Sequence, residues 1–308
     1  MNHQPRGKNL GLAPAIQIWS AVPTPLTPAL RVDAPSVRRL VGAALADGVT
    51  GLFLGGSCGE GPWLPDREQV RLIRTAADRA RGRLTLAAQV TDHSVPRIRD
   101  NVARAADAGA DLAIIAPPLL MDNPTPDRIA GFFTEAAAAS LLPVGVYDLG
   151  RHRAFSLPDS HLRRIYELPN VVLVKDSSGS LERRALALAA RRRRPGLRLF
   201  NGDEFRCVEY LAAGYDGCIF GGAAAVGAQL RRVVGEFSVG RRVEAERAAA
   251  EMNRLLFGIY GGPAFTCWLT GLKYCLVRRG LFRTTASFLG YPLNRSCRAF
   301  IDRLVARG

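Results

Sequence analysis

The chain has 308 residues, 48% hydrophobic and 22% charged, which suits a soluble globular protein with a substantial core. No apolar run is long enough to span a bilayer, and the N-terminus lacks the apolar segment of a signal peptide. Six scattered cysteines without a C-x-x-C pair favour a cytoplasmic protein with reduced thiols. The four histidines are not spaced like metal ligands, so we expect no metal and no other cofactor, although carboxylate sites for Mg²⁺ stay open.

The formal net charge of +15 raises the question of a nucleic-acid partner. The basic residues are spread along the chain, and the one dense run, Arg191–Arg194, precedes Pro195-Gly196, as at a helix C-terminus where cations complement the dipole. No nucleic-acid-binding motif is present, so an anionic small molecule is the favoured partner. Only three of the 42 basic residues are lysines, namely Lys8, Lys175 and Lys273, so arginine meets nearly every need for positive charge.

Short apolar runs alternate with longer amphipathic ones along most of the chain. The short runs predict strands at residues 16–21, 51–55, 84–90, 112–116, 144–147, 171–175, 197–201 and 217–220. The amphipathic runs predict helices at residues 34–46, 66–80, 95–107, 127–139, 158–167, 181–193, 205–213 and 226–237. Asp33, Ser94 and Thr125 stand where N-caps are expected.

Each strand–helix unit spans about 30 residues, which predicts an α/β fold of the (β/α)8 TIM-barrel type. An open doubly wound sheet is the alternative, weakened because no G-x-G-x-x-G follows the first strand. After residue 238 the pattern turns purely helical, at residues 241–256, 264–279 and 295–307. We therefore expect an N-terminal arm (1–14), a barrel with the active site (15–237) and a C-terminal three-helix appendage (238–308).

Lys175 ends the apolar run Val171–Val174, which is typical of a strand buried on both faces. A guanidinium stays protonated, whereas a desolvated lysine can lose its proton and attack a carbonyl to form a Schiff base. A lysine here in an arginine-rich chain therefore suggests a need for an amine. A side chain that snorkels to solvent, or that pairs with Asp176, is an equally good interpretation of this strand alone.

Two other expected strand ends carry candidate site residues, since active sites of barrels lie at the C-terminal ends of strands. The glycine-rich loop Gly55–Glu60, with Gly56, Ser57 and Cys58, offers successive backbone N–H groups to an anion such as a carboxylate. On its own, however, it is better explained as a plain turn. Tyr147 is either a core aromatic or a residue that moves protons.

The last two strands end near polar or small residues. Asp203 and Glu204 stand at the first turn of an expected helix, so capping is their favoured role, with binding of substrate hydroxyls as a second one. Gly221 follows the eighth strand and is expected to border the substrate.

The set GGSCGE, Tyr147 on the fifth strand, VVLVKDSSG and NGDE resembles the dihydrodipicolinate synthase / N-acetylneuraminate lyase family of Schiff-base-forming class I aldolases. The resemblance covers about residues 15–300. It implies that Lys175 forms the imine with the 2-oxo group of pyruvate or of a substrate that contains pyruvate. It also implies that Ser57 and Cys58 hold the carboxylate and that Tyr147 moves protons to and from the reacting oxygen.

The sequence departs from the family pattern at three places. Cys58 brings a thiol, a poor donor, where the family has a hydroxyl. The run Pro117-Pro118-Leu119-Leu120 stands where the synthase has a tyrosine pair, and His152, between Arg151 and Arg153, stands near its substrate-binding arginine. These departures favour a hydroxylated 2-oxo acid, derived from a sugar or an aromatic breakdown product, over the substrate of the synthase. Asp203-Glu204 resembles the acidic pair of the sialate lyases.

We therefore expect a lyase that works through a lysine Schiff base, either by retro-aldol cleavage and condensation with pyruvate or by dehydration. Dihydrodipicolinate synthase proper and a catalytically silent relative that binds 2-oxo acids are the alternatives. The resemblance also implies a homotetramer, or a homodimer if the contact around residues 117–120 is lost. Lys273 has no derived role and is expected at the surface.

Overall fold

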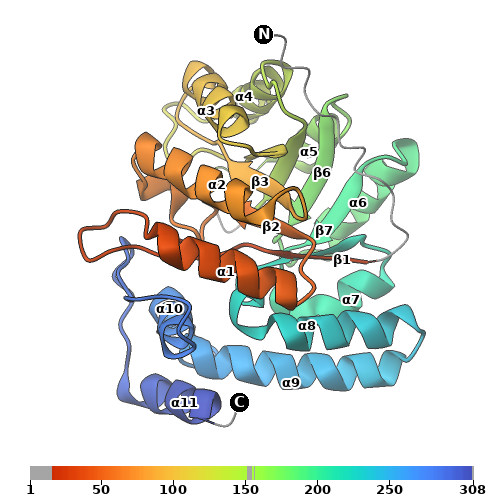
Figure 1. Ribbon diagram of the computed structural model, residues 1–308. Helices are drawn as coiled ribbons and strands as arrows, with labels where there is room; N and C mark the ends of the chain where they lie inside the picture. Colours follow the sequence, from red (N-terminus) through yellow and green to blue (C-terminus); the bar gives the residue numbers. More distant parts are fainter. Residues whose placement is uncertain (1–15, 151–154, 156, 307–308) are drawn as a thin grey trace.

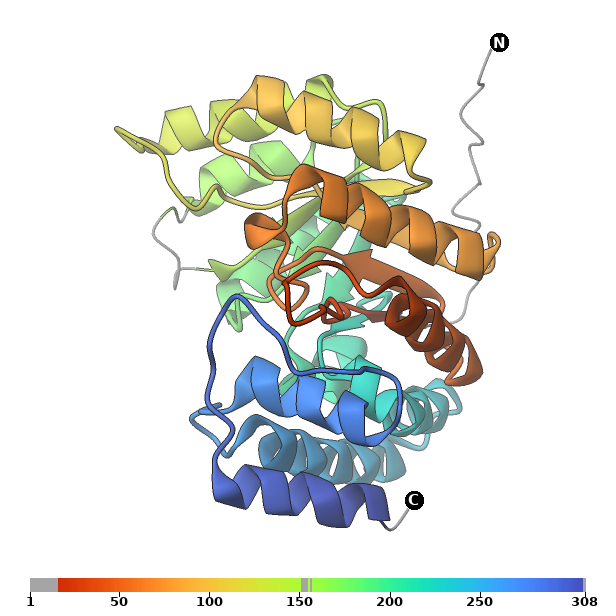
Figure 2. The same ribbon diagram turned by 60° about the vertical axis from the view of Figure 1, so that its left-hand side comes forward.

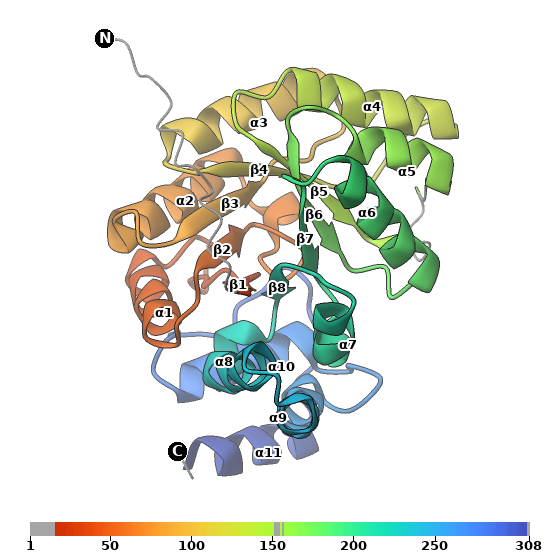
Figure 3. The same cartoon turned by 90° about the vertical axis from the view of Figure 1, so that its right-hand side faces the viewer.

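The computed structural model describes residues 16–150, 155 and 157–306. Within them, eight parallel strands form a closed barrel in which each strand pairs with the next and β1 pairs with β8 (Figure 3). This arrangement confirms the predicted TIM barrel. The strands are β1 (Gln17–Ser20), β2 (Gly51–Leu54), β3 (Thr85–Gln89), β4 (Leu112–Ile115), β5 (Val144–Asp148), β6 (Val171–Asp176), β7 (Arg198–Asn201) and β8 (Gly217–Phe220).

Helices follow the strands and cover the outside of the barrel (Figure 1). The bounds of α1, α2, α3 and α6 agree with the predicted ranges residue for residue. Across the described ranges, no helix combines the length and apolar character needed to cross a membrane. The helices are α1 (Ala34–Ala46), η1 (Gly61–Trp63), α2 (Asp66–Ala80), α3 (Val95–Asp107), α4 (Pro126–Ala138), α5 (Asp159–Tyr166), α6 (Leu181–Arg193), η3 (Glu204–Arg206), α7 (Cys207–Ala212) and α8 (Ala223–Ser238).

The three expected N-caps have different outcomes. Thr125 caps α4, because its hydroxyl accepts a 3.3 Å hydrogen bond from the backbone N–H of Arg128. Asp33 and Ser94 do precede α1 and α3, but neither side chain caps its helix, so this part of the prediction is wrong. The Asp33 carboxylate instead accepts a 2.6 Å hydrogen bond from the hydroxyl of Ser36.

Large side chains fill the inside of the barrel. Trp19 contacts Phe200, with their ring centroids 4.9 Å apart. Gly51 leaves room for this indole, since a Cβ at that position would lie 2.4 Å from it. Phe53, Leu173 and Ile219 belong to the same buried cluster. Because the interior is packed, a substrate has access only to the mouth of the barrel, where the strands end.

Three further helices lie on one side of the barrel and confirm the predicted appendage: the first two pack against α8, and the third packs against those two (Figures 1 and 2). The rings of Phe205, Phe257 and Phe265 stack at centroid distances of 4.6 to 6.1 Å and join η3 to the first of these helices. The segment after the second helix returns to the barrel, where the Thr284 hydroxyl donates to the carbonyl of Leu26. The three helices are α9 (Arg242–Tyr260), α10 (Trp268–Arg278) and α11 (Arg295–Ala306).

Candidate active site

Lys175 and Tyr147 lie side by side at the C-terminal end of the barrel. They are direct partners in the register of β5 and β6. The Nζ atom of Lys175 lies 3.6 Å from the centroid of the Tyr147 ring and 5.4 Å from that of Phe53. Both side chains are buried, with exposed fractions of 4% for Lys175 and 7% for Tyr147. The fold thus brings together the two residues predicted to be catalytic.

Lys175 neither extends to solvent nor pairs with Asp176, which are the two alternatives that the sequence left open. Its burial is incompatible with an amine that snorkels to solvent. Asp176 accepts hydrogen bonds from the backbone N–H of Ser178, at 2.9 Å, and from the hydroxyl of Tyr215, at 2.7 Å. Among the described residues, the lysine with a carboxylate partner is Lys273 rather than Lys175. Lys175 is therefore a buried amine whose described neighbours are the rings of Tyr147 and Phe53, and it is not among the residues that line the cavity described below.

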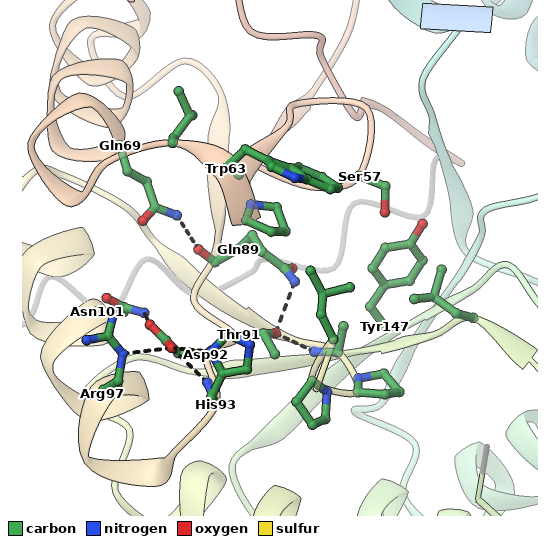
Figure 4. Close-up of a pocket in the computed structure, with 18 of the residues that line it drawn as sticks. Ser57, Trp63, Gln69, Gln89, Thr91, Asp92, His93, Arg97, Asn101 and Tyr147 are labelled. Atoms are coloured by element: carbon green, nitrogen blue, oxygen red, sulfur yellow. Dashed lines mark hydrogen bonds and ion pairs between the residues drawn. The ribbon is translucent and has the colours of Figure 1, made fainter. Parts of the chain in front are cut away.

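The phenol of Tyr147 has unusual acidity. Burial alone raises its pKa, but the positive charge of Lys175 and hydrogen bonding with Lys175 and Ser57 outweigh burial and bring the pKa below its ordinary value of 10.0. In Figure 4 the hydroxyls of Ser57 and Tyr147 point toward one another. This environment makes Tyr147 a better proton donor than an ordinary tyrosine.

We expect Tyr147 to ionise before the other buried tyrosines as the pH rises. Burial raises the pKa of Tyr166, Tyr210, Tyr215 and Tyr260, whereas the pKa of Tyr147 is lowered. An ultraviolet titration should therefore show a phenolate signal below pH 10 that Tyr147→Phe removes. A variant that loses signal only at the alkaline end would contradict this assignment. If turnover needs the Tyr147 proton, kcat/KM falls as the pH rises through the same pKa.

The glycine-rich loop (Gly55–Glu60) follows β2 and carries Ser57 to Tyr147. The loop turns so tightly that a Cβ on Gly61 would lie 1.8 Å from the carbonyl oxygen of Gly55. The backbone N–H groups of Ser57 and Cys58 have no backbone partner among the described residues. Such N–H groups in a tight turn suit an anion, and the predicted binding of a carboxylate by Gly56, Ser57 and Cys58 stays a prediction.

Lys273 holds this loop from the appendage. Glu60 ends the loop in the left-handed region, with φ of 57°, which is uncommon for a residue other than glycine. Its carboxylate pairs with Lys273 and accepts hydrogen bonds from the Ser287 hydroxyl, at 2.8 Å, and the Phe288 N–H, at 2.6 Å. Lys273 and Glu60 are fully buried, and Lys273 also donates to the carbonyl of Ala286. The expectation that Lys273 lies at the surface is wrong.

Cys58 packs against the eighth strand. A Cβ on Gly221, the residue after β8, would lie 3.2 Å from the Sγ atom of Cys58, so the thiol occupies the space beside this glycine. Burial raises the pKa of this thiol, assisted by the negative charge of Glu204. Cys58 and Gly221 are not among the residues that line the cavity described below, so their predicted contact with substrate stays a prediction.

We expect Cys58 to resist alkylation in the folded protein, because a buried thiol with a raised pKa supplies little thiolate. Peptide mapping after treatment with iodoacetamide at neutral pH would measure its modification. The same chain unfolded in urea provides the control, since every cysteine is then accessible. Modification of Cys58 at similar rates in both states would contradict the buried position.

Asp203 and Glu204 bind groups of the protein itself. Asp203 caps η3, as predicted, by accepting a 3.2 Å hydrogen bond from the N–H of Phe205. The Glu204 carboxylate accepts from the Tyr260 hydroxyl, at 2.7 Å, and from the Gly222 N–H, at 2.8 Å. Burial raises the pKa of Glu204. Neither residue lines the cavity, and their binding of substrate hydroxyls stays a prediction.

A cavity of about 600 Å³ borders Ser57 and Tyr147 and extends toward the ends of β3 and β4 (Figure 4). Its lining includes Trp63 on η1 and Gln89, the last residue of β3, which the sequence reasoning missed. A signal for Gln89 did exist, since it lies at a strand end, where the active-site residues of barrels are found.

The departures from the family pattern lie beside the cavity or outside the described residues. Pro117, Pro118 and Leu119 line the cavity, while Leu119 and Leu120 are 59% and 65% exposed. The run from Arg151 to Arg153, including His152, falls outside the described residues.

The sequence model of the dihydrodipicolinate synthetase family matches residues 15–288. A 4-hydroxy-tetrahydrodipicolinate synthase of Listeria welshimeri is 27% identical over 266 residues, which cover 86% of this chain and 89% of that protein. A dihydrodipicolinate synthase from Bacteroides thetaiotaomicron has a similar structure, with a TM-score of 0.85, 24% identity and coverage of 96% of this chain and 99% of that one. A third relative is YagE of E. coli K12, described as a prophage protein of the dihydrodipicolinic acid synthase family and solved in complex with pyruvate. Its TM-score is 0.85 at 20% identity, with coverage of 95% of this chain and 98% of that one.

The family match includes Ser57, Tyr147 and Lys175, and it spans most of the chain. The likeness in structure extends over the barrel and the appendage together. The chain therefore belongs to the dihydrodipicolinate synthetase family of lyases.

Proposed function

We propose that the protein is a lyase in which Lys175 forms an imine with the 2-oxo group of a substrate that contains a pyruvate moiety. The observation that carries this proposal is the buried amine of Lys175, 3.6 Å from the centre of the Tyr147 ring. An amine kept from water beside a proton donor meets the needs of imine formation. The Ser57 hydroxyl and the N–H groups of the glycine-rich loop bind the substrate carboxylate.

The first half of the reaction joins substrate and enzyme. The neutral amine of Lys175 attacks C2, and Tyr147 donates a proton to the former carbonyl oxygen. The nitrogen then gives a proton back to the Tyr147 phenolate, which leaves a neutral carbinolamine. Tyr147 protonates the carbinolamine hydroxyl, which leaves as water, and a protonated imine remains. The imine withdraws electrons from C3 and so stabilises the negative charge that develops there in the next step.

The second half follows one of two routes from the same imine. In retro-aldol cleavage, the C4 hydroxyl loses its proton and the C3–C4 bond breaks. The electron pair of that bond moves into an enamine, and an aldehyde leaves. In dehydration, C3 loses a proton to form the enamine, and the C4 hydroxyl then leaves as water with a proton from the site. On the retro-aldol route the enamine takes up a proton at C3 to become an imine again, and on both routes hydrolysis of the final imine frees Lys175.

Borohydride trapping with pyruvate tests the proposal. Reduction converts the imine into a stable secondary amine, and peptide mass mapping should place the adduct on Lys175. A characterised dihydrodipicolinate synthase treated in parallel provides the positive control. If that control is labelled fully and this protein is not, the imine mechanism is wrong.

Dihydrodipicolinate synthase proper is a second candidate, because the curated relative from Listeria carries the name of that enzyme. The sequence Pro117–Leu120 argues against it, because it lacks the tyrosine pair of the synthase. Formation of 4-hydroxy-tetrahydrodipicolinate, the product in the name of that relative, distinguishes the candidates. A catalytically silent relative would form the pyruvate adduct and turn over no 2-oxo acid.

We also propose a cytoplasmic homotetramer or homodimer. The exposed Leu119 and Leu120 support a contact between copies, and the six buried cysteines, none in a disulfide, suit a reducing compartment. Light scattering after size exclusion would distinguish tetramer, dimer and monomer.

A further inference from the structure

A buried carboxylate follows Lys175 directly in the chain. Asp176 is the last residue of β6 and is 1% exposed, and no ion pair within the described ranges includes it. Three neutral donors bond to it instead: the N–H of Ser178 at 2.9 Å, the Ser178 hydroxyl at 2.6 Å and the Tyr215 hydroxyl at 2.7 Å. A buried carboxylate needs such donors, so each of them constrains where Asp176 can lie.

One of these donors comes from a distant part of the chain. Tyr215 stands just before β8 and is 3% exposed. The residue that follows it, Asp216, pairs with Arg191 of α6 at 3.2 Å and with Arg198 of β7 at 3.1 Å. These ion pairs fix the backbone next to Tyr215. The Tyr215 hydroxyl is therefore a firm point of attachment for Asp176.

The end of β6 is tied to its neighbours through the backbone as well. The N–H of Ser177 donates to the carbonyl of Asp148 on β5 at 2.8 Å, and the N–H of Gly202, after β7, donates to the carbonyl of Asp176 at 2.6 Å. Lys175 directly precedes this point, and its side chain leaves the strand on the opposite face from that of Asp176. A shift of Asp176 would therefore move the amine of Lys175 as well.

We propose that Tyr215 is a positioning residue, which holds the amine of Lys175 in place for imine formation by fixing the Asp176 carboxylate. This inference rests on the imine chemistry proposed for Lys175. Tyr215 is not among the residues that line the cavity, so it acts through Asp176 and not on the substrate. The effect on rate is large because a displacement of about 1 Å at the reacting atoms can cost about 100-fold.

The variant Tyr215→Phe keeps the buried ring and removes the bond to Asp176. Stopping the reaction of the protein and pyruvate with borohydride at successive times measures the rate at which the adduct forms. We expect the rate at saturating pyruvate to fall by about 10-fold or more. The pyruvate concentration that gives half this rate should stay within about 2-fold of that of the wild type, because the glycine-rich loop is unchanged.

The matched control is Tyr210→Phe. The rings of Tyr210 and Tyr215 meet edge to face with centroids 4.9 Å apart, but the Tyr210 hydroxyl is not among the described donors to Asp176. Tyr210→Phe therefore removes a hydroxyl from the same buried region without loosening Asp176. Its rate of adduct formation should stay within about 2-fold of that of the wild type.

The titration of Tyr147 gives a second readout, which does not require the imine. The positive charge of Lys175 helps to lower the pKa of Tyr147, whose ring centre lies 3.6 Å from the amine. A displaced amine should let this pKa rise in Tyr215→Phe and not in Tyr210→Phe. A loss of stability alone would leave the pKa of Tyr147 in the folded protein unchanged.

A double variant tests the route through Asp176. If Tyr215 acts through this carboxylate, adding Tyr215→Phe to Asp176→Asn should change the rate by less than about 2-fold. A further loss as large as that of Tyr215→Phe alone would overturn the proposal. When the wild type forms its adduct, either readout left unchanged by Tyr215→Phe would overturn the positioning role and leave the imine mechanism intact. Equal losses in Tyr215→Phe and Tyr210→Phe would also overturn it. Absence of the adduct from the wild type would overturn both proposals.

Discussion

Replacing Lys175 by methionine is expected to lower kcat/KM for the 2-oxo acid substrate by about 10⁵-fold or more. Enzymes commonly accelerate their reactions by at least about 10⁶-fold, and this variant loses the covalent route entirely. Methionine suits the buried position, because it has a similar length and needs no hydrogen-bond partner. Steady-state kinetics and borohydride trapping with pyruvate would measure the loss of turnover and of adduct together.

Lys175→Arg serves as the matched control. It keeps a positive charge near Tyr147, but a guanidinium cannot form the imine, so adduct and turnover should disappear here as well. The two variants should differ in the titration of Tyr147. Removal of the charge in Lys175→Met raises the pKa of Tyr147, whereas Lys175→Arg keeps it low. Substantial turnover by either variant would exclude Lys175 as the nucleophile.

Replacing Lys273 by methionine is expected to lower the free energy of unfolding by about 3–5 kcal/mol, the usual effect of leaving one buried charge without its partner. The Glu60 carboxylate would stay fully buried and lose the ammonium group that balances it. Urea unfolding would show a lower midpoint with a similar slope, because the surface exposed on unfolding changes little.

Arg278→Met provides a control on the same helix. Arg278 pairs with Asp302 at the surface, where its side chain is 42% exposed, so its loss should change stability by less than about 1 kcal/mol. The double variant Glu60→Gln with Lys273→Met removes both buried charges and should recover part of the lost stability. Equal effects of Lys273→Met and Arg278→Met would contradict a structural role for the buried pair.

The sequence predicted that Lys175 and Tyr147 lie at the same mouth of the barrel, because both residues stand at the ends of apolar strands. Neighbouring parallel strands bring such ends to one mouth, so Lys175 and Tyr147 meet through the regular register of β5 and β6. Most helix bounds were predictable for a similar reason, since amphipathic spacing and flanking glycines act locally. The prediction that the Asp33 and Ser94 side chains cap their helices is wrong, because the hydrogen-bond partner that a polar side chain takes depends on competing groups nearby.

Two other residues depend on contacts that no local pattern reports. Lys273 pairs with Glu60, which lies 213 residues earlier in the chain. A lysine on a helix is ordinarily expected at the surface. The strand end indicates the position of Gln89, but only the structure shows that its amide oxygen is buried without a hydrogen-bond partner among the described residues. Long-range pairing and unsatisfied polar atoms are properties of the packed molecule and not of its hydrophobic pattern.

During synthesis on the ribosome, the residues of the barrel are made before those of the appendage. Glu60 is made early, whereas Lys273, Ser287 and Phe288 follow 213, 227 and 228 residues later. These three residues hold the Glu60 carboxylate and, through it, the left-handed bend that ends the glycine-rich loop. The loop therefore acquires its final shape only after nearly the whole chain has been synthesised. Nascent chains that end before these residues lack every group that holds the Glu60 carboxylate in place.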